Sequence, residues 1–510
     1  MLRMLLTPLL LVVALLARAP PACGSALPFL NGVDLSYVPQ AEAQGFKYYA
    51  TRAGKQEDPV TVVARNGANI ARLRIWNDPP YPNQTYATLS NAVRMAKRVR
   101  AAGMAVHLDL QFSDWWADPG KQWMPRAWSG CSGWEQYSPT SDGCRDSIPE
   151  LAELVYNFTG RAVHAVTEAT GSPPEVIQVG NEITNGMLWT SAPVECAVGG
   201  GTWRQPQQAQ VTACEAAHAC APNRTGQGCR HDCRTLSDCG SEDNVSACAK
   251  SYLDGRQRCS NWPRLVGLLN ASIGAVRAAS PTTKVMVHLS DWGKAIWWLN
   301  MAEAAGIAPF DMLGVSYYQQ FRSLTSGGPL NILRCNCSWC LGAVQARWPE
   351  LPIVIVETSY PFETFDNPWN FTELNGDFEF SPRGQAAYLA SLLQLAKESA
   401  MGGVYWWCPE CADGYWRDFS SAYFHQALFD HDGVALEAQK AWSKPEASWT
   451  ECSAALRDAC PWSGGRCSNC SACVDGAAAT GALRACSEGA KDQWCLGVFG
   501  PRTTSELRCV

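Results

Sequence analysis

Short apolar segments recur along the chain, and polar or aromatic residues follow each of them directly. The segments are four to seven residues long. Many are rich in β-branched residues, which is typical of buried strands in a parallel sheet. The segments that we assign to strands span residues 32–35, 70–75, 104–110, 176–179, 284–289, 312–316, 353–356 and 403–406.

Amphipathic stretches of helical length lie between these strands. They span residues 85–102, 148–170, 262–279, 294–305 and 384–399. The first of them stops just before Gly103, and glycine commonly ends a helix. Eight strands that alternate with helices are typical of a (β/α)8 barrel, whose functional residues follow the strands. We therefore predict an α/β fold, a TIM barrel, over residues 27–443.

Two cysteine-rich stretches interrupt the alternation. Residues 196–259 carry eight cysteines between the fourth strand and its helix, and residues 450–510 carry another eight. Neither stretch is long enough to bury a core of its own, so we predict a disulfide-stapled insertion and a disulfide-stapled C-terminal region. Spacings such as Cys408-Pro-Glu-Cys411 also occur in zinc sites, but disulfides are the more common use in a secreted chain.

The N-terminus predicts secretion. Residues 1–26 combine an early arginine, an apolar run and small residues, as in a cleaved signal peptide. The run is shorter than the ~20 apolar residues that span a bilayer, and we expect no membrane anchor. An oxidising compartment accounts for the 24 cysteines. The N-glycosylation sequons that fit an extracellular protein lie at Asn83, Asn157, Asn223, Asn244, Asn270, Asn336, Asn370 and Asn469.

The composition of the chain favours some classes of binding partner over others. A net charge of −6 without a basic block argues against nucleic acid. The 22 tryptophans favour a carbohydrate or another flat ligand, although packing explains any single one equally well. We expect no cofactor and assign no metal site, and the oligomeric state stays open.

Two of the predicted strands end in a glutamate. The fourth runs into Gly180-Asn181-Glu182, and the seventh into Glu357. Hydrolysis of a glycosidic bond requires one carboxylic acid at the leaving oxygen and one carboxylate at the anomeric carbon. Each glutamate alone could be a salt-bridge partner, but two in matched contexts favour a catalytic pair.

The ordered motifs resemble those of glycoside hydrolase family 53, the arabinogalactan endo-β-1,4-galactanases. The resemblance covers roughly residues 27–442. Asn-Glu alone is shared by a clan of barrel glycosidases, whereas the ordered set is specific. The motifs are Gly-Val-Asp-Leu-Ser at 32–36, Arg-Leu-Arg-Ile-Trp at 72–76, Leu-Asp-Leu at 108–110, Ser-Asp-Trp-Trp-Ala-Asp-Pro at 113–119, Gly-Asn-Glu-Ile at 180–183, His-Leu-Ser-Asp at 288–291, Gly-Val-Ser-Tyr-Tyr at 314–318 and Val-Glu-Thr at 356–358.

This resemblance implies a secreted, retaining endo-acting enzyme whose partner is a polysaccharide, β-1,4-galactan. Glu182 would be the acid/base and Glu357 the nucleophile. Retention requires carboxyl groups ~5–5.5 Å apart, against ~6.5–9.5 Å for inversion. Burial or the charge of Glu357 should raise the pKa of Glu182. Asn181 could hydrogen-bond a sugar hydroxyl beside the reacting carbon.

Further residues are expected to bind substrate or support the pair. Arg74 or Arg72 could keep Glu357 ionised, or could instead form salt bridges with Asp109 inside the barrel. The hydroxyl of Tyr317 could hold Glu357. The resemblance adds Asp114 as a substrate-binding residue.

His288 and Asp291 are interpreted as subsite residues, although a histidine such as His288 is often simply a core residue. Trp406 and Trp407 could form a flat wall for a sugar ring. Neighbours on a strand alternate faces, so one of the two could point outward and leave Trp407 as the binding residue.

Two departures from the family pattern bear on the substrate. Gln111 stands where the family has histidine, and Cys408-Pro stands where it commonly has Glu-Pro. We expect Cys408 to join a disulfide that reshapes the final loop. Alternatives are another retaining β-glycanase acting on mannan or glucan, and a non-catalytic glycan-binding protein. The glutamate pair argues against the non-catalytic alternative.

Overall fold

The computed structural model describes residues 27–79, 86–119, 121–130, 147–188, 262–290, 292–318, 341–365, 378–411 and 421–443. Several expectations lie outside the described residues. They concern the signal peptide, the insertion at 196–259, the C-terminal region at 450–510, Asp291 and the sequons at Asn83, Asn223, Asn244, Asn336, Asn370 and Asn469.

Eight parallel strands of the described residues close into a barrel, which confirms the predicted fold. They are β1 (Leu30–Asp34), β4 (Ile70–Ile75), β5 (Ala105–Leu110), β6 (Val176–Val179), β7 (Lys284–Leu289), β8 (Met312–Ser316), β9 (Ile353–Thr358) and β10 (Gly403–Trp406). Each strand pairs with its neighbour in sequence, and β1 closes the ring against β10. All eight predicted strands are therefore present, with small shifts at their ends. The short strands β2 (Tyr48–Tyr49) and β3 (Gln56–Glu57) form a separate antiparallel pair.

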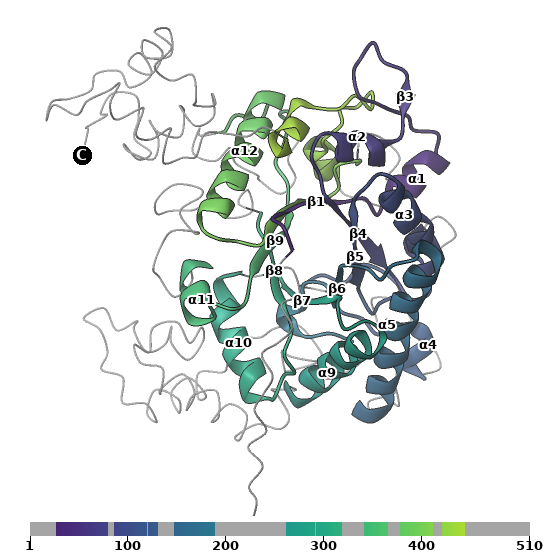
Figure 1. The fold of residues 1–510 in the computed structure, drawn as a ribbon, viewed down its shortest axis with the longest axis vertical. Helices are drawn as coiled ribbons and strands as arrows, with labels where there is room; N and C mark the ends of the chain where they lie inside the picture. Colours follow the sequence, from purple (N-terminus) through teal and green to yellow (C-terminus); the bar gives the residue numbers. More distant parts are fainter. Residues whose placement is uncertain are drawn as a thin grey trace, which may run out of the picture.

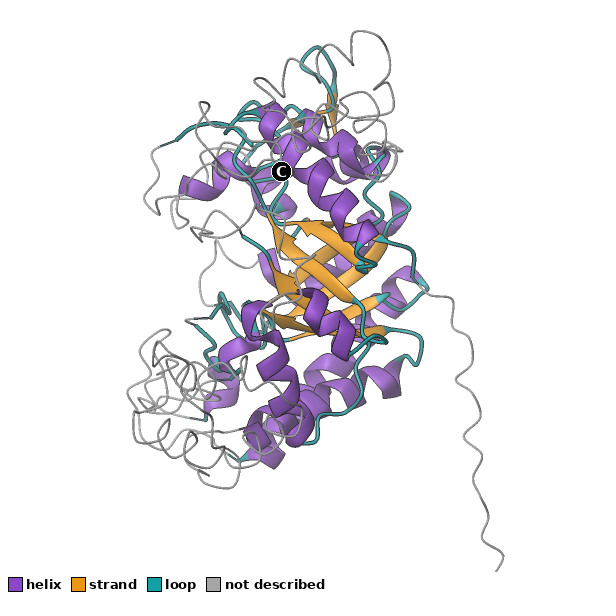
Figure 2. Cartoon of the chain, turned by 90° about the vertical axis from the view of Figure 1, so that its left-hand side faces the viewer, coloured by secondary structure: helices purple, strands orange, loops and turns teal. Residues whose placement is uncertain are grey.

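Helices surround the barrel on its outside (Figure 1), and Figure 2 shows the strands at the centre of the molecule. The α-helices are α1 (Val38–Ala43), α2 (Pro59–Arg65), α3 (Leu89–Ala101), α4 (Arg126–Ser129), α5 (Ile148–Thr170), α9 (Trp262–Ala279), α10 (Ala295–Ala304), α11 (Leu341–Arg347) and α12 (Pro382–Glu398). The 3₁₀ helices are η2 (Ile183–Asn185), η3 (Trp292–Lys294), η6 (Ser421–Gln426) and η7 (Glu437–Trp442). In the part of the chain that the structure describes, no helix has the length and apolar character needed to cross a bilayer.

The five predicted helices correspond to α3, α5, α9, α10 and α12. The structure adds short helices, among them α1, α2 and α11, that are too brief for an apolar periodicity to reveal. A local signal does mark α2. Asp58 accepts a hydrogen bond from Val60 N at the start of the helix, and Pro59 occupies its first position.

An apolar layer fills one end of the barrel interior. We call it the plug; it consists of Leu30, Ile70, Val176, Met286, Met312, Val354, Val356 and Tyr405. Most of these residues come early in their strands, and the inward positions further along are polar or charged, as with Arg72 and Asp109. A larger apolar cluster packs between the strands and the helices. The barrel therefore keeps water out at one end and collects its polar side chains toward the carboxyl ends of the strands.

Strand β9 contains a β-bulge just before Glu357. Val315 pairs with Ile355, but the next residue of β8, Ser316, pairs with Glu357. The same extra residue appears against β10, where Val404 pairs with Ile355 and Trp406 with Thr358. Strict alternation from the plug residue Val356 would turn Glu357 toward the helices. The bulge instead turns Glu357 into the barrel.

Candidate active site

The carboxyl ends of six neighbouring strands supply the side chains of the candidate site. β4, β5 and β6 supply Arg72, Asp109 and the Asn181–Glu182 pair. β7, β8 and β9 supply the remaining three, His288, Ser316 and Glu357. The two glutamates predicted from the sequence therefore lie at the same rim of the barrel.

Glu182 sits on a sharp turn at the end of β6. Its backbone is left-handed, with φ 50° and ψ 43°, which is uncommon for a residue with a side chain. Gly180, two residues earlier, has φ 90°, and a Cβ atom there would lie 2.6 Å from Ile183 Cγ2. Glycine is therefore required at this turn, and such backbone strain is concentrated at functional sites.

The carboxyl group of Glu182 accepts a hydrogen bond from Ser316. Ser316 Oγ lies 2.6 Å from Glu182 Oε1 and 2.9 Å from His288 Nε2. The backbone N–H of Glu182 faces His288 Nδ1 at 3.3 Å. Nδ1 also faces the amide nitrogen of Gln178 at 3.1 Å and the amide oxygen of Asn181 at 3.0 Å. Two donors and one acceptor thus face Nδ1, which favours the tautomer with the proton on Nε2. Hydrogen bonds then run in one direction, from His288 through Ser316 to Glu182.

Both carboxylate oxygens of Glu357 are held. Oε1 lies 2.9 Å from Arg72 Nη1, and Oε2 accepts a hydrogen bond of 3.0 Å from the Tyr318 hydroxyl. The backbone carbonyl of Glu357 accepts from Tyr317 N at 2.8 Å. The side chain is buried, at 8% exposure. Its orientation is thus fixed from β4 and from β8.

Arg72 lies among three carboxylates in the interior of the barrel. Its Nη1 lies 2.8 Å from Asp34 Oδ2, and its Nη2 lies 2.9 Å from Asp109 Oδ2, in addition to the Glu357 contact. The side chain is 1% exposed. Sequence analysis offered two roles for the arginines, support of Glu357 or a salt bridge with Asp109, and Arg72 makes both contacts.

Amides complete the surroundings of Arg72. Nη2 donates to Asn181 Oδ1 at 2.6 Å, and Nε donates to Gln178 Oε1 at 3.1 Å. Gln178 Nε2 in turn donates to Asp109 Oδ1 at 2.7 Å. Asn181 Nδ2 donates to Ala117 O at 2.7 Å, which fixes the amide next to Glu182. The buried charges are therefore hydrogen-bonded as well as paired, which is the condition for tolerating them in a core.

The two glutamates differ in protonation. Burial raises the pKa of Glu182 well above its ordinary value, and the charge of Glu357 raises it further. Burial raises the pKa of Glu357 to about 7, with Arg72 and the Tyr318 hydrogen bond opposing the rise. Glu182 therefore holds its proton in a pH range where Glu357 has already lost its own. Burial and Arg72 also lower the pKa of His288 far enough to keep the imidazole neutral.

The hydroxyl that contacts Glu357 comes from Tyr318, the residue after the one that the sequence indicated. Tyr317 instead places its buried ring 6.4 Å from that of Trp292. The reason is the alternation of β8. Ser316 points into the barrel, Tyr317 toward the helices and Tyr318 inward again.

The carboxylate of Asp114 accepts hydrogen bonds from two backbone N–H groups. Its Oδ1 accepts from Asp78 N at 2.9 Å, and its Oδ2 accepts from Arg126 N at 2.7 Å. Burial raises its pKa to about 6, and the two N–H donors lower it. The contacts join the loops after β4 and β5, so Asp114 organises the rim next to the site.

An aromatic cluster lies beside the charged centre. The guanidinium of Arg74 lies 4.3 Å from the ring centre of Tyr37, 4.5 Å from that of Trp76 and 4.1 Å from that of Trp116. Trp407 continues the cluster, with its ring centre 6.3 Å from that of Trp116. Arg74 therefore supports aromatic rings, while its neighbour Arg72 supports Glu357.

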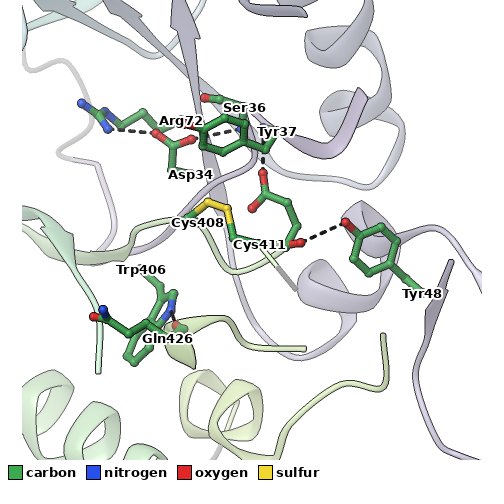
Figure 3. The surroundings of a disulfide bond; sticks show 10 residues. Asp34, Ser36, Tyr37, Tyr48, Arg72, Trp406, Cys408, Cys411 and Gln426 are labelled. Carbon is green, nitrogen blue, oxygen red and sulfur yellow. Dashed lines mark hydrogen bonds and ion pairs between the residues drawn. A yellow bond between two sulfur atoms is a disulfide. The ribbon is translucent and has the colours of Figure 1, made fainter. Parts of the chain in front are cut away.

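Trp406 and Trp407 point to opposite sides, as alternation along β10 predicted. Trp406 is fully buried and its Nε1 donates to Gln426 O at 2.9 Å (Figure 3). Trp407 joins the aromatic cluster on the inner side. Trp407, which the sequence indicated as the residue that stacks on a sugar ring, is thus the tryptophan that faces the site.

The two departures from the family pattern fit the local structure. Gln111 Oε1 accepts from Trp76 Nε1 at 2.8 Å, and Gln111 Nε2 donates to Asp109 Oδ2 at 3.1 Å. Cys408 forms a disulfide with Cys411 next to Tyr37 (Figure 3).

The short loop between the two cysteines is tied to the β1 side of the rim. Glu410 Oε1 accepts from Tyr37 N at 2.8 Å, and Glu410 O accepts from the Tyr48 hydroxyl at 3.0 Å. Burial raises the pKa of Glu410 to about 8.

Sequence reasoning did not select four residues of this site, namely Asp34, Gln178, Ser316 and Tyr318. A signal existed for Gln178, which is the polar residue in the otherwise apolar Val176–Val179 strand. Asp34 and Ser316 carry a similar signal, because each is a polar residue at the end of a buried strand. The sequence could show that Tyr318, and not Tyr317, faces the barrel interior only if the inward and outward positions were counted along β8 from its buried residues.

Known proteins resemble this chain in sequence. The family model described as Glycosyl hydrolase family 53 matches residues 30–219 and 244–442. An arabinogalactan endo-beta-1,4-galactanase of Cellvibrio japonicus is 27% identical over 406 residues, which cover 78% of this chain and 84% of the relative. An enzyme of the same name from Thermothelomyces thermophilus is 25% identical over 417 residues, which cover 80% of this chain and 97% of the relative.

Solved structures share the fold. The GH53 catalytic domain of Ignisphaera aggregans has a TM-score of 0.57 at 26% identity, covering 82% of this chain and 97% of that domain. A fungal beta-1,4-galactanase structure has a TM-score of 0.58 at 24% identity, covering 82% of this chain and all of the other. The barrel therefore belongs to an established fold.

Replacing Arg72 by methionine should destabilise the protein strongly. Arg72→Met leaves three buried carboxylates without their cation, and breaking a buried pair costs about 3–5 kcal/mol. Without Arg72 the folded-state pKa values of Asp109 and Glu357 rise, so the protein takes up protons and the loss shrinks as pH falls. Urea unfolding at pH 8 and pH 5 measures both effects.

The control is Arg52→Met. Arg52 also bridges two carboxylates, Asp430 and Asp432, but its side chain is 68% exposed. The change should have a much smaller effect, because solvent screens exposed pairs. An equal loss in both variants, or a loss at Arg72 that does not depend on pH, would contradict the role given to Arg72.

Proposed function

The chain belongs to glycosyl hydrolase family 53, and on that basis we propose that it is a secreted, retaining endo-β-1,4-galactanase that cleaves galactan chains. The observation that carries the proposal is the pair Glu182 and Glu357, two carboxyl groups at one rim, of which Glu182 keeps its proton to a higher pH than Glu357. Family membership makes the chain a glycoside hydrolase. The geometry supports the roles of the two residues.

Glu182 is proposed as the acid/base. A general acid must carry a proton at the start of the cycle, and burial together with Glu357 keeps one on Glu182. Because Ser316 donates to Oε1, Oε2 is the oxygen that can carry the proton. Glu182 gives this proton to the glycosidic oxygen as the bond to the anomeric carbon breaks.

Glu357 is proposed as the nucleophile. Its carboxylate attacks the anomeric carbon and forms a covalent glycosyl ester while the protonated sugar leaves. Water then attacks the same carbon and gives a proton to Glu182, and the ester bond breaks to restore Glu357. Arg72 and Tyr318 hold the carboxylate in place before attack and lower its pKa toward the ionised state.

The neighbouring groups suit a sugar ring. Asn181, fixed by Arg72 and Ala117, lies directly beside Glu182 and is proposed to hydrogen-bond the hydroxyl next to the reacting carbon. Trp407 and the aromatic cluster offer flat faces for stacking. His288, neutral and bonded to Ser316, acts through Ser316 on the acid and is not placed as a direct sugar contact.

The substrate is proposed from the relatives, which are named arabinogalactan endo-beta-1,4-galactanases and match most of this chain. Secretion is proposed from residues 1–26. A soluble enzyme released outside the cell would reach a wall polysaccharide without transport.

We expect the protein to release oligosaccharides from linear β-1,4-galactan and far less product from β-1,4-mannan or β-1,4-glucan. Reducing-sugar release over this panel measures the preference, and the product sizes show whether cleavage is internal. Proton NMR of the first product should show the β anomer before mutarotation, as retention requires. Activity on mannan alone would overturn the substrate, and an α product would overturn the retaining mechanism.

Alanine variants should separate the two glutamates. Glu357→Ala and Glu182→Ala should each lower kcat on galactan by at least about 100-fold, because a carboxyl group that acts in the reaction is lost. With an activated aryl galactoside, azide should replace the missing group in each variant. It should give the β-galactosyl azide with Glu182→Ala and the α-galactosyl azide with Glu357→Ala.

The matched control is Glu168→Ala, at an exposed position of α5. This change should leave kcat unchanged. If the two azide products are exchanged, the roles are reversed, and if Glu357→Ala retains native activity, Glu357 is not the nucleophile.

The pH profile of kcat/KM should fall on its acid side near pH 7, where Glu357 gains a proton, and on its basic side at a higher pH, where Glu182 loses one. Tyr318→Phe removes a hydrogen bond that lowers the pKa of Glu357. The acid limb should therefore move up, by about one pH unit for a bond to a charged group.

Tyr317→Phe is the control, because its ring lies on the other side of β8. The acid limb should stay in place in this variant. A shift with Tyr317→Phe but none with Tyr318→Phe would contradict the assignment of the hydroxyl that holds Glu357.

A further inference from the structure

Three side chains that could hold a metal ion converge from the segments that follow β9 and β10. They are Glu363, in the segment after β9, His425 of η6 and His431 in the turn that follows. One ligand atom from each lies within 4.8 Å of the other two. His425 Nδ1 lies 2.6 Å from Glu363 Oε1, and His431 Nε2 contacts the same oxygen. Two of the chain's seven histidines thus meet at one carboxylate oxygen.

Packing holds the two imidazole rings in this position. The ring of Phe365 stacks on His425 at 4.5 Å between centres and 12° between planes. The ring of Phe362 lies 5.4 Å from that of His431. In addition, Phe362 N donates to His425 O at 2.8 Å. The ligand atoms are therefore positioned by apolar and backbone contacts and would not have to be assembled by the ion.

The cluster is open to solvent on one side. The side chains of His425, His431 and Glu363 are 22%, 34% and 35% exposed. An ion can thus enter from water, and a water molecule can complete its coordination. The cluster is separate from Arg72 and the two active-site glutamates, so it does not depend on the proposed function.

We propose that Glu363, His425 and His431 form a Zn²⁺ site. Two imidazole nitrogens and one carboxylate oxygen suit a borderline ion such as Zn²⁺, whereas Ca²⁺ and Mg²⁺ prefer sets of oxygen ligands. Around a tetrahedral ion with bonds of about 2.0–2.1 Å, the ligand atoms stand about 3.3 Å apart. Each of the two contacts between an imidazole nitrogen and Glu363 Oε1 would need to lengthen by less than about 1 Å for an ion to replace the shared protons.

The ion would join two segments that are distant in sequence. Glu363 lies six residues after Glu357, while His425 and His431 follow β10. A shared ion would therefore brace the loop that continues from the nucleophile against the last part of the barrel rim. Its role is structural, and it adds a metal site that the sequence alone did not assign.

Zinc binding by the full-length protein tests the site. The protein is stripped with EDTA, freed of chelator and dialysed against ZnCl₂, and bound zinc is measured by mass spectrometry. Glu363→Gln, His425→Gln and His431→Gln should each retain one zinc ion fewer per chain than the native protein. The difference is diagnostic, because other residues of the chain could bind zinc as well. His164→Gln, an exposed histidine on α5, is the matched control and should lose none.

Two further readouts separate zinc ligation from misfolding. Zinc should raise the Tm of the native protein and of His164→Gln by a few degrees, but not that of Glu363→Gln, which keeps the shape of the side chain. The affinity should weaken at least about tenfold in each ligand variant. Equal zinc content in all variants overturns the site. A rise in Tm with CaCl₂ that requires Glu363, without one for ZnCl₂, overturns the choice of metal.

Discussion

The candidate site depends on a single guanidinium held inside a barrel. Arg72 offsets the charges of Asp34, Asp109 and Glu357 in a region that the plug closes off from water on one side. Such a cluster is tolerated in a core only if its remaining hydrogen-bond donors and acceptors also have partners. The side-chain amides of Gln178 and Asn181 provide these partners for Arg72. The position of β4 therefore constrains residues at four other strands, β1, β5, β6 and β9, because each of them must reach the same cation.

This constraint produces an asymmetry between two chemically identical side chains. Glu357 contacts Arg72 directly, so the cation offsets part of the cost of its burial. The carboxyl group of Glu182 instead accepts a hydrogen bond from the neutral hydroxyl of Ser316 and faces the charge of Glu357. One carboxyl is thereby prepared to carry a proton and the other to carry a charge. The difference arises from position around the barrel axis and from no feature of either glutamate itself.

The sequence predicted the barrel well, because parallel strands buried on both faces leave long apolar runs followed by polar loops. It also predicted Glu182 and Glu357 as the candidate pair, since both follow such runs. It did not resolve which of Tyr317 and Tyr318 faces inward, or that Asp114 binds backbone, because these depend on a local count of residues. Glu363 and His425 are 62 positions apart, and only tertiary structure brings them together.

The bulge in β9 has a consequence for protein engineering. The plug residue Val356 and Glu357 are adjacent in sequence, yet both point into the barrel. Transplanting the catalytic pair to another barrel by copying side chains onto a regular strand would turn the second glutamate toward the helices. The graft must carry the additional residue as well. The functional unit at this position is thus a backbone irregularity together with its side chain, and substitutions alone would not reproduce it.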